Sequence, residues 1–163
     1  MALLGCHKEA PAPPVDPTEK LPPATQVGQR TLGCLVNGQP WTPAGNPFAG
    51  PLLSAVYLNG RLGISASRVL VVNGRNSFHR LGFSIQNVHG AGTFLLADST
   101  STGSYEDFDT RCTYQTFAAQ SGTVVLTKFD PVNRIVSGRF NFALEAPGCG
   151  RVEVSDGRFD VRF

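Results

Sequence analysis

Hydrophobic and polar residues alternate with a period of two over most of the chain after residue 31. This period is the spacing of side chains on one face of a β-strand, so the alternation predicts strands with one face turned towards a core. Two further runs, residues 68–72 and 124–126, are apolar on both faces and predict central strands. The alternating apolar sets are Leu62, Ile64 and Ala66; Leu81, Phe83 and Ile85; Phe140, Phe142 and Leu144; Val152 and Val154; and Phe159, Val161 and Phe163.

Short turn sequences separate these runs. Asn37-Gly38, Asn59-Gly60 and Asn73-Gly74 each follow an apolar run, and both residues of such a pair tolerate a positive φ, which favours two-residue hairpins. Asp130-Pro131 opens a type I turn, because proline fixes φ at the second turn position. At Asp156-Gly157 the inward-facing set changes parity, which predicts either a turn or a bulge within one long strand.

These patterns place the chain in the all-β class, with about ten short and mostly antiparallel strands and no stretch of helical period. Alternation does not distinguish an antiparallel β-sandwich from a closed β-barrel, and both remain open at this point. The length of 163 residues has room for one domain. We place this single all-β domain at residues 31–163.

The segment before the domain is rich in proline. Six of the twelve prolines lie in the first 23 residues. Proline lacks a backbone donor and prefers the extended polyproline II conformation, so residues 7–30 are predicted to form a disordered linker, or stalk.

Cys6 stands before this linker. The sequence Leu3-Leu4-Gly5-Cys6 matches a bacterial lipobox, in which an apolar residue and a small residue precede the cysteine that is acylated. We therefore predict lipidation of Cys6 and interpret residues 1–6 as the remnant of a lipoprotein signal. Because the charged part and most of the apolar part of such a signal are missing, we expect the coding sequence to begin upstream of Met1.

Export to an oxidising compartment allows the remaining cysteines to form one disulfide. Cys112 and Cys149 both flank strands next to turn residues, where the backbone can adjust to disulfide geometry, so we predict that they pair. Cys34 alternates with Leu32 and Val36 and is predicted to be a small buried hydrophobic residue.

Several segments resemble an uncharacterised all-β domain found in Bacteroidota lipoproteins. They are Gly33-Cys34-Leu35-Val36-Asn37-Gly38 with Trp41, then residues 122–130, Val136-Ser137-Gly138-Arg139-Phe140-Asn141-Phe142, and the closing residues 154–161. The resemblance implies a secreted or membrane-anchored domain of unknown function, and it brings no catalytic residues.

Candidate chemistry is sparse. The net charge of +2 is spread thinly, without the basic cluster that a nucleic-acid partner needs. The cysteines lack zinc-ligand spacing, so we predict no metal and no cofactor. His79 shares its strand face with Leu81 and is predicted to pack, while His89 lies in a turn. The acidic segment 98–109, with Glu106, Asp107 and Asp109, is predicted to be a solvated loop rather than a weak calcium site, because the spacing of a calcium loop is absent. Asp156 and Asp160 are assigned no role as a pair, because the sequence does not tell their separation.

Aromatic residues supply the candidate contact surface. Tyr105 and Phe108 lie in the acidic segment, where they could anchor a partner. Trp41 is either a stacking platform for a ligand or a core residue. We include Trp41, Tyr105 and Phe108 in the candidate surface.

The sequence thus favours a lipoprotein of the bacterial cell envelope, anchored to the membrane and carrying a non-catalytic binding or structural domain. Its partner would be an envelope protein or a glycan, and display on the periplasmic face or on the cell surface stays open. We expect no enzyme, because no nucleophile elbow or phosphate-binding loop occurs. The alternative is a secreted hydrolase whose site is assembled only in space, and a histidine–serine contact or two carboxylates in one cleft would favour it.

Overall fold

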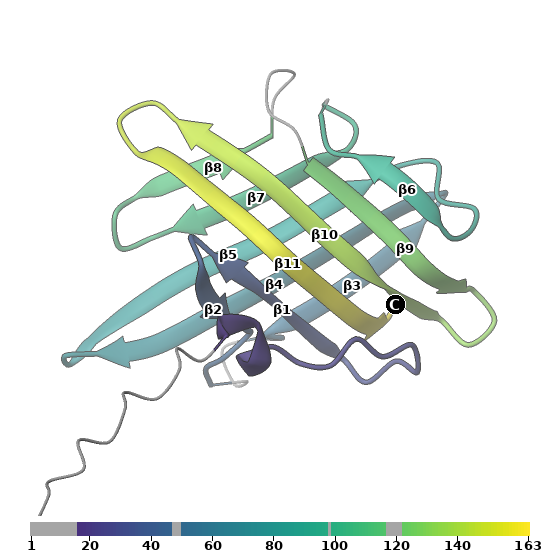
Figure 1. Cartoon of the computed structure of the whole chain (residues 1–163), viewed down its shortest axis with the longest axis horizontal. Coiled ribbons are helices and arrows are strands. Elements are labelled where there is room, and N and C mark those ends of the chain that lie inside the picture. Colours follow the sequence, from purple (N-terminus) through teal and green to yellow (C-terminus); the bar gives the residue numbers. More distant parts are fainter. Residues whose placement is uncertain (1–15, 47–49, 98, 117–121) are drawn as a thin grey trace, which may run out of the picture.

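In the residues that the computed structural model describes (16–46, 50–97, 99–116 and 122–163), eleven strands form two antiparallel sheets (Figure 1). The six-stranded sheet has the order β2-β1-β11-β10-β9-β6, and the five-stranded sheet has the order β3-β4-β5-β7-β8. The strands are β1 (Thr31–Val36), β2 (Gln39–Trp41), β3 (Leu53–Leu58), β4 (Arg61–Val72), β5 (Arg75–Ile85), β6 (Gly92–Leu95), β7 (Thr102–Asp107), β8 (Cys112–Gln115), β9 (Gly122–Asp130), β10 (Ile135–Ala146) and β11 (Gly150–Arg162).

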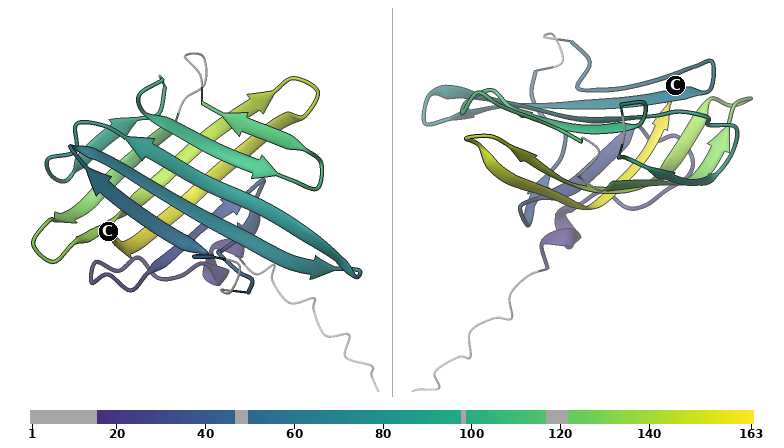
Figure 2. Two further views of the ribbon diagram at one scale, coloured as in Figure 1. Left: turned by 180° about the vertical axis from the view of Figure 1, so that it is seen from behind. Right: turned by 90° about the horizontal axis from the view of Figure 1, so that it is seen from above.

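The two sheets lie face to face as two layers, which the view from above shows (Figure 2). Each sheet has its own edge strands, β2 and β6 in one and β3 and β8 in the other. The fold is therefore a β-sandwich, and of the two predicted architectures the closed barrel is not formed. The chain has one four-residue 3₁₀-helix, η1 (Pro17–Lys20), among the described residues, and none of their helices is long and apolar enough to cross a membrane.

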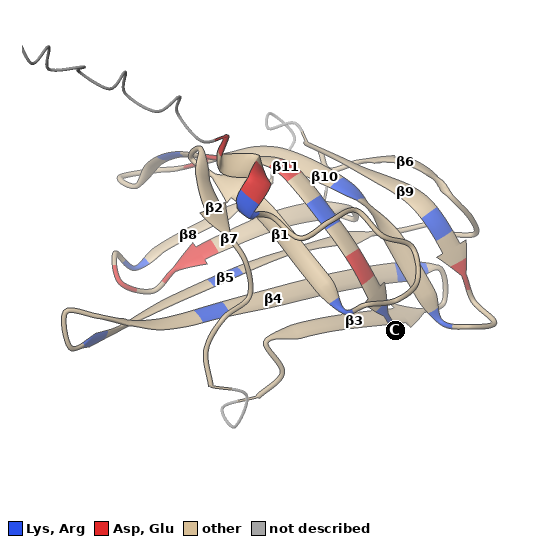
Figure 3. Cartoon of the chain, turned by 60° about the horizontal axis from the view of Figure 1, so that its bottom comes forward, with Lys and Arg blue, Asp and Glu red and all other residues tan. Residues whose placement is uncertain are grey.

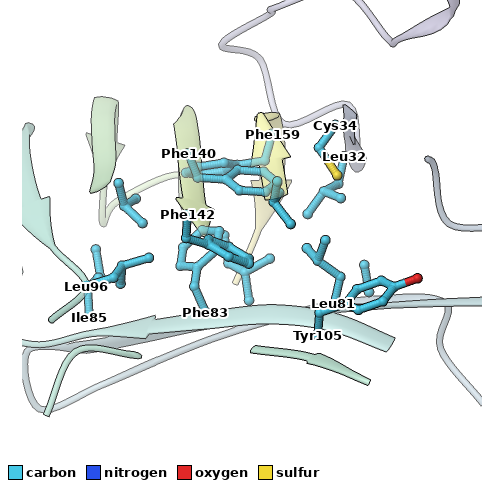
Figure 4. Packing of buried hydrophobic residues seen from close by; sticks show 14 of the residues in the cluster. Leu32, Cys34, Leu81, Phe83, Ile85, Leu96, Tyr105, Phe140, Phe142 and Phe159 are labelled. Carbon is cyan, nitrogen blue, oxygen red and sulfur yellow. The ribbon is translucent and has the colours of Figure 1, made fainter. Parts of the chain in front are cut away.

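The apolar faces predicted from alternation meet between the layers. Phe140, Phe142 and Phe159 from the six-stranded sheet point towards Leu81 and Phe83 of the other sheet (Figure 4). Phe83 contacts both Phe140 and Phe159, with ring centroids 5.3 and 5.4 Å apart. Cys34 is fully buried in the same cluster, as predicted, and burial raises the pKa of its thiol to about 12.

The turn predictions are confirmed by the backbone. Asn59 and Gly60 have φ values of 51° and 79°, and the two other Asn-Gly pairs are alike, so each pair forms a hairpin turn with positive φ at both residues. Asp156, with φ of 52°, lies inside β11 where the pairing with β10 shifts register. The parity change at Asp156-Gly157 is therefore a bulge and not a turn.

The prediction of a buried central strand over residues 68–72 is wrong at its far end. β3 ends its pairing at Ala66, and beyond it only the isolated bridge from Ala44 to Arg68 flanks β4 on that side among the described residues. From Leu70 on, β4 pairs only with β5, and the two strands continue as a protruding hairpin (Figure 1). Val71 and Val72 at its tip are 71% and 51% exposed. Apolar character on both faces here reflects a two-stranded ribbon and not burial by two layers.

Residues 16–30 correct the predicted linker. Residues 1–15 lie outside the described part of the chain, but from Asp16 onward the segment folds onto the domain. Leu21 is buried, and Pro22 packs so closely on β1 that a Cβ added at Gly33 would lie 2.4 Å from its ring. The domain therefore begins before residue 31, and the physical reason lies in Asp160.

Asp160 of β11 is a carboxylate that is only 1% exposed. It accepts five hydrogen bonds, four of them from the segment that precedes β1. The donors are Thr25 Oγ1 (2.7 Å), the backbone N–H groups of Val27 (3.0 Å), Gly28 (2.8 Å) and Gln29 (3.2 Å), and Ser137 Oγ (2.7 Å). Burial raises the pKa of Asp160, but these hydrogen bonds outweigh burial and hold the pKa at about 2.

The predicted disulfide between Cys112 and Cys149 is present, and it closes a sequence separation of 37 residues. Cys112 begins β8, and Cys149 lies in the turn between β10 and β11, so the bond joins the two sheets. Next to it, the Tyr114 hydroxyl donates a hydrogen bond of 2.8 Å to the carbonyl of Cys149.

Candidate functional site

A cleft of about 270 Å³ lies at the end of the sandwich where β2 approaches the base of the β4–β5 hairpin. One wall comes from the six-stranded sheet and the other from the inward face of the five-stranded sheet. The lining residues are Val36, Gln39, Pro40, Trp41, Arg68, Leu70, Ser77, His79 and Tyr105. Basic positions on β4 and acidic positions near the end of β7 lie at this end of the molecule (Figure 3).

Trp41 closes the short strand β2, where it pairs with Cys34 of β1. Its side chain is 4% exposed, yet its indole Nε1 has no hydrogen-bond partner among the described residues, and it is the only buried side-chain N or O atom there of which this is true. A buried donor without an acceptor destabilises a fold by about 1–3 kcal/mol. Nε1 is itself covered by protein, so an acceptor from outside would satisfy it only after a shift of the Trp41 side chain.

Arg68 stands on the inward face of β4, directly opposite His79 of β5. Its guanidinium reaches towards β2, where Nη1 donates a long hydrogen bond of 3.4 Å to the carbonyl of Pro40. The side chain is half-buried, and no carboxylate of the described residues forms an ion pair with it. Most of its five donors are thus available to a group in the cleft.

His79 connects the cleft with the acidic residues through a chain of hydrogen bonds. Burial, and then the charge of Asp107, raise the pKa of Tyr105 well above its usual value, so its hydroxyl keeps its proton. This hydroxyl lies 2.8 Å from His79 Nδ1. With the ring proton of a neutral His79 assigned to Nε2, Nδ1 accepts from Tyr105. Nε2 then donates to Ser77 Oγ, 3.2 Å away.

The chain ends at Asp109. A hydrogen bond from Ser77, followed by one from the backbone N–H of Phe78, lowers the pKa of Asp109. Ser77 therefore donates a hydrogen bond to Asp109 while it accepts one from His79. This direction is opposite to the one that nucleophilic catalysis needs, in which the serine donates to the histidine.

Three ligand atoms beside the cleft could hold a divalent cation. One atom each from His79, Asp107 and Asp109 lie within 4.8 Å of one another, and His79 Nε2 is 3.8 Å from Asp107 and 3.7 Å from Asp109. A cation would have to displace the Nε2 proton, and Nδ1 would then donate to Tyr105. The set is partly exposed, and its polar atoms already satisfy one another.

The predicted contact surface is divided by the structure. Trp41 and Tyr105 are 4% and 5% exposed, belong to the core cluster and line the cleft. The core alternative for Trp41 is therefore confirmed, and neither residue is part of an exposed contact surface. Phe108 is 45% exposed, stacks on Phe78 with centroids 4.4 Å apart, and lies beneath Arg80. It faces away from the cleft residues. Cys6 lies outside the described residues.

Sequence reasoning missed Arg68 and Ser77 as residues of the cleft. Arg68 was treated as the start of an apolar run, and nothing in the sequence shows that β2 crosses its path. Ser77 and His79 are two positions apart, and this spacing predicts that they share one face of their strand. Their carboxylate partners come from β7 and the turn after it, which alternation alone does not place.

Three other hollows among the described residues exceed the cleft in volume, and the smallest of them, of about 330 Å³, lies on the five-stranded sheet beside Ser54 and Arg80. Of the two largest, one of about 510 Å³ lies on the outer face of the five-stranded sheet beside Val56 and Leu58, and one of about 480 Å³ lies between residues 20–22 and β3. Neither contains a buried polar atom without a partner in the part of the chain that the structure describes. Volume alone does not indicate a ligand, so the cleft is the stronger candidate.

Residues 59–160 match the family described as "Domain of unknown function (DUF6252)", which spans more than half of the chain. No curated protein and no solved structure matches this chain. The chain belongs to this family of uncharacterised domains.

Proposed function

We propose that this family member is a lipid-anchored lipoprotein of the bacterial cell envelope, and that its domain binds a small ligand and does not catalyse a reaction. The lipid would be carried by Cys6 and the ligand by the cleft beside Trp41. The observation that carries the binding part is a cleft wall in which the half-buried Arg68 forms no ion pair with the described residues, next to the buried Trp41 Nε1 without an acceptor.

The anchoring part rests on the lipobox at Leu3-Leu4-Gly5-Cys6 and on the proline-rich segment behind it. Because the chain is docked from Asp16 onward, only the nine residues 7–15 separate Cys6 from the domain. Nine residues reach at most roughly 30 Å when fully extended. The domain would therefore lie within about its own diameter of the lipid surface. This holds for the periplasmic face and for the cell surface alike.

Two measurements test the two parts separately. The intact mass of the protein purified from its native membrane fraction, compared with the variant Cys6→Ser, should show a chain that begins at an acylated Cys6. An unmodified Cys6 in a soluble chain would remove the anchoring part. The binding part is tested by fluorescence, since Trp41 is the only tryptophan and reports on the cleft directly.

The fluorescence titration uses single amino acids, neutral monosaccharides and uronic acids as probes. Saturable changes with at least one probe class are expected, with no change in the unfolded chain. A flat response to all three classes would contradict a small-ligand cleft and would favour an envelope-structural role.

The hydrolase alternative has one specific observation in its favour, the contact of 3.2 Å between Ser77 Oγ and His79 Nε2. It ranks second because the carboxylates Asp107 and Asp109 lie on the Nε2 side of the ring, while Nδ1 is occupied by Tyr105. An activated serine needs a carboxylate on the other ring nitrogen. Hydrolysis of p-nitrophenyl acetate that is lost in Ser77→Ala but kept when the exposed Ser65 is replaced by alanine would revive this alternative.

A further inference from the structure

We propose that the cleft recognises a carboxylate, and that its ligand is a small monocarboxylate with an apolar body. The carboxylate would lie between the Arg68 guanidinium and Trp41 Nε1. This inference rests on the proposal that the cleft is a binding site, and it names the chemistry of the ligand.

The donors in this part of the cleft require an acceptor. Arg68 presents a planar fork that matches the two oxygens of a carboxylate, and its hydrogen bond to the Pro40 carbonyl is long at 3.4 Å. Trp41 Nε1 adds a single donor that is buried and unpaired. The half-buried guanidinium is open to the cleft, whereas Nε1 is reached only after the Trp41 side chain shifts. A carboxylate that accepts from both has enough lone pairs for all three N–H groups.

The rest of the lining selects the body of the ligand. Val36, Pro40 and Leu70 are apolar and face the same space as the guanidinium. A volume of about 270 Å³ holds a ligand of roughly the size of an amino acid or a branched short-chain acid. An apolar body against these side chains adds burial to the charge-assisted contact.

The acidic residues argue against a ligand with more negative charge. Asp107 and Asp109 lie beyond His79, on its Nε2 side, whereas Arg68 extends towards Pro40. Their two carboxylates repel a second negative group at the far end of the cleft. A monoanion is therefore favoured over inorganic phosphate or a dicarboxylate, which would place more charge beside them.

The test compares two compounds that differ in one group. The probes are 4-methylpentanoate and its amide 4-methylpentanamide, titrated into the full chain while Trp41 fluorescence is followed, with inorganic phosphate as a third probe. The carboxylate should bind at least about 10-fold more tightly than the amide, because the amide loses the charge-assisted fork. Equal affinity for acid and amide, or tighter binding of phosphate, would overturn the inference of a carboxylate, while saturable binding itself would still support a ligand cleft.

Variants assign the two donors. Arg68→Gln should weaken binding of 4-methylpentanoate by about 10-fold or more, and Arg68→Lys should weaken it less, since charge remains but the fork is lost. Arg75→Gln on the same hairpin is the matched control, because Arg75 is exposed at the tip. Unchanged affinity in a folded Arg68→Gln protein would refute the assignment.

Trp41→Phe separates a binding role from a packing role. It keeps an aromatic ring but removes the unpaired donor, so binding of the acid, measured by calorimetry, should weaken several-fold while the free protein loses little stability. A variant that binds the acid as tightly as the parent would remove Trp41 from the site.

Discussion

The buried carboxylate of Asp160 offers the sharpest test of how the N-terminal segment is held. We expect Asp160→Asn to lower the free energy of unfolding at pH 7 by about 2–4 kcal/mol. In one orientation the new amide turns its NH₂ group towards the N–H groups of Val27 and Gln29, and in the other towards that of Gly28. Either way at least one backbone donor loses its acceptor in a buried position, at about 1–3 kcal/mol each, and the charge is lost as well.

The same carboxylate predicts a pH dependence. Its pKa is about 2 in the folded protein, below the ordinary value of 3.8, so it stabilises the fold at every pH above 3.8. That contribution disappears as the pH falls from about 4 to about 2, because the unfolded chain binds the proton first. The difference of just under two pKa units corresponds to about 2 kcal/mol.

The assay is urea unfolding at pH 7, 4 and 2, followed by Trp41 fluorescence and circular dichroism. The stability difference between the parent and Asp160→Asn should be largest at pH 7 and should shrink by about 2 kcal/mol at pH 2. Asp156→Asn is the matched control, because it lies in the same strand, is exposed, and has the positive φ of 52° that asparagine tolerates. Equal stability of the two variants at pH 7, or a difference that does not depend on pH, would refute the reasoning.

Three further predictions concern the frame around the cleft. Replacing Cys112 and Cys149 by alanine should destabilise the chain by about 3–4 kcal/mol, as expected for a closed loop of 37 residues, and a reductant should then have no further effect on urea unfolding. A chain that starts at residue 31 should be less stable than one that starts at residue 16 by about 3–5 kcal/mol in the same assay, since it loses the burial of Leu21 and the donors to Asp160; equal stability would restore the linker to its predicted length. Gly138→Ala should lower the melting temperature, because the added Cβ would lie 2.2 Å from the Val125 carbonyl, and such overpacking destabilises a fold by about 1–3 kcal/mol. Gly63→Ala is the control and should leave the melting temperature unchanged, because nothing lies within 4 Å of the added Cβ.

Much of the fold could be predicted because its signals are local. Alternation assigned Leu81, Phe83 and Phe140 to the core, and the φ values of the Asn-Gly pairs follow from the residues themselves. The disulfide was also predictable, because only cysteines close to turns had the freedom to meet. A period of two and a preference for positive φ depend on neighbours in the sequence, and they hold whichever strands pair in the end.

The candidate site was less predictable because its members are brought together by pairing between distant strands. Trp41, Arg68 and Tyr105 come from three separate strands, and none of them has a local signal for the others. Trp41 was assigned to a surface or a core by residue type alone, and its unpaired donor is visible only when every neighbour is in place.

The sequence by itself determined the class of the fold, the inward faces of its strands, the positions of its tight turns and the pairing of two cysteines. Only the tertiary structure decided that the sheets form a sandwich, that β2 closes a cleft over the β4–β5 hairpin, and that residues 25–29 wrap around a carboxylate more than 130 positions away. The physical reason is that strand pairing and the burial of polar groups depend on the summed packing of the whole chain. A buried charge such as Asp160 is stable only where that packing supplies its donors.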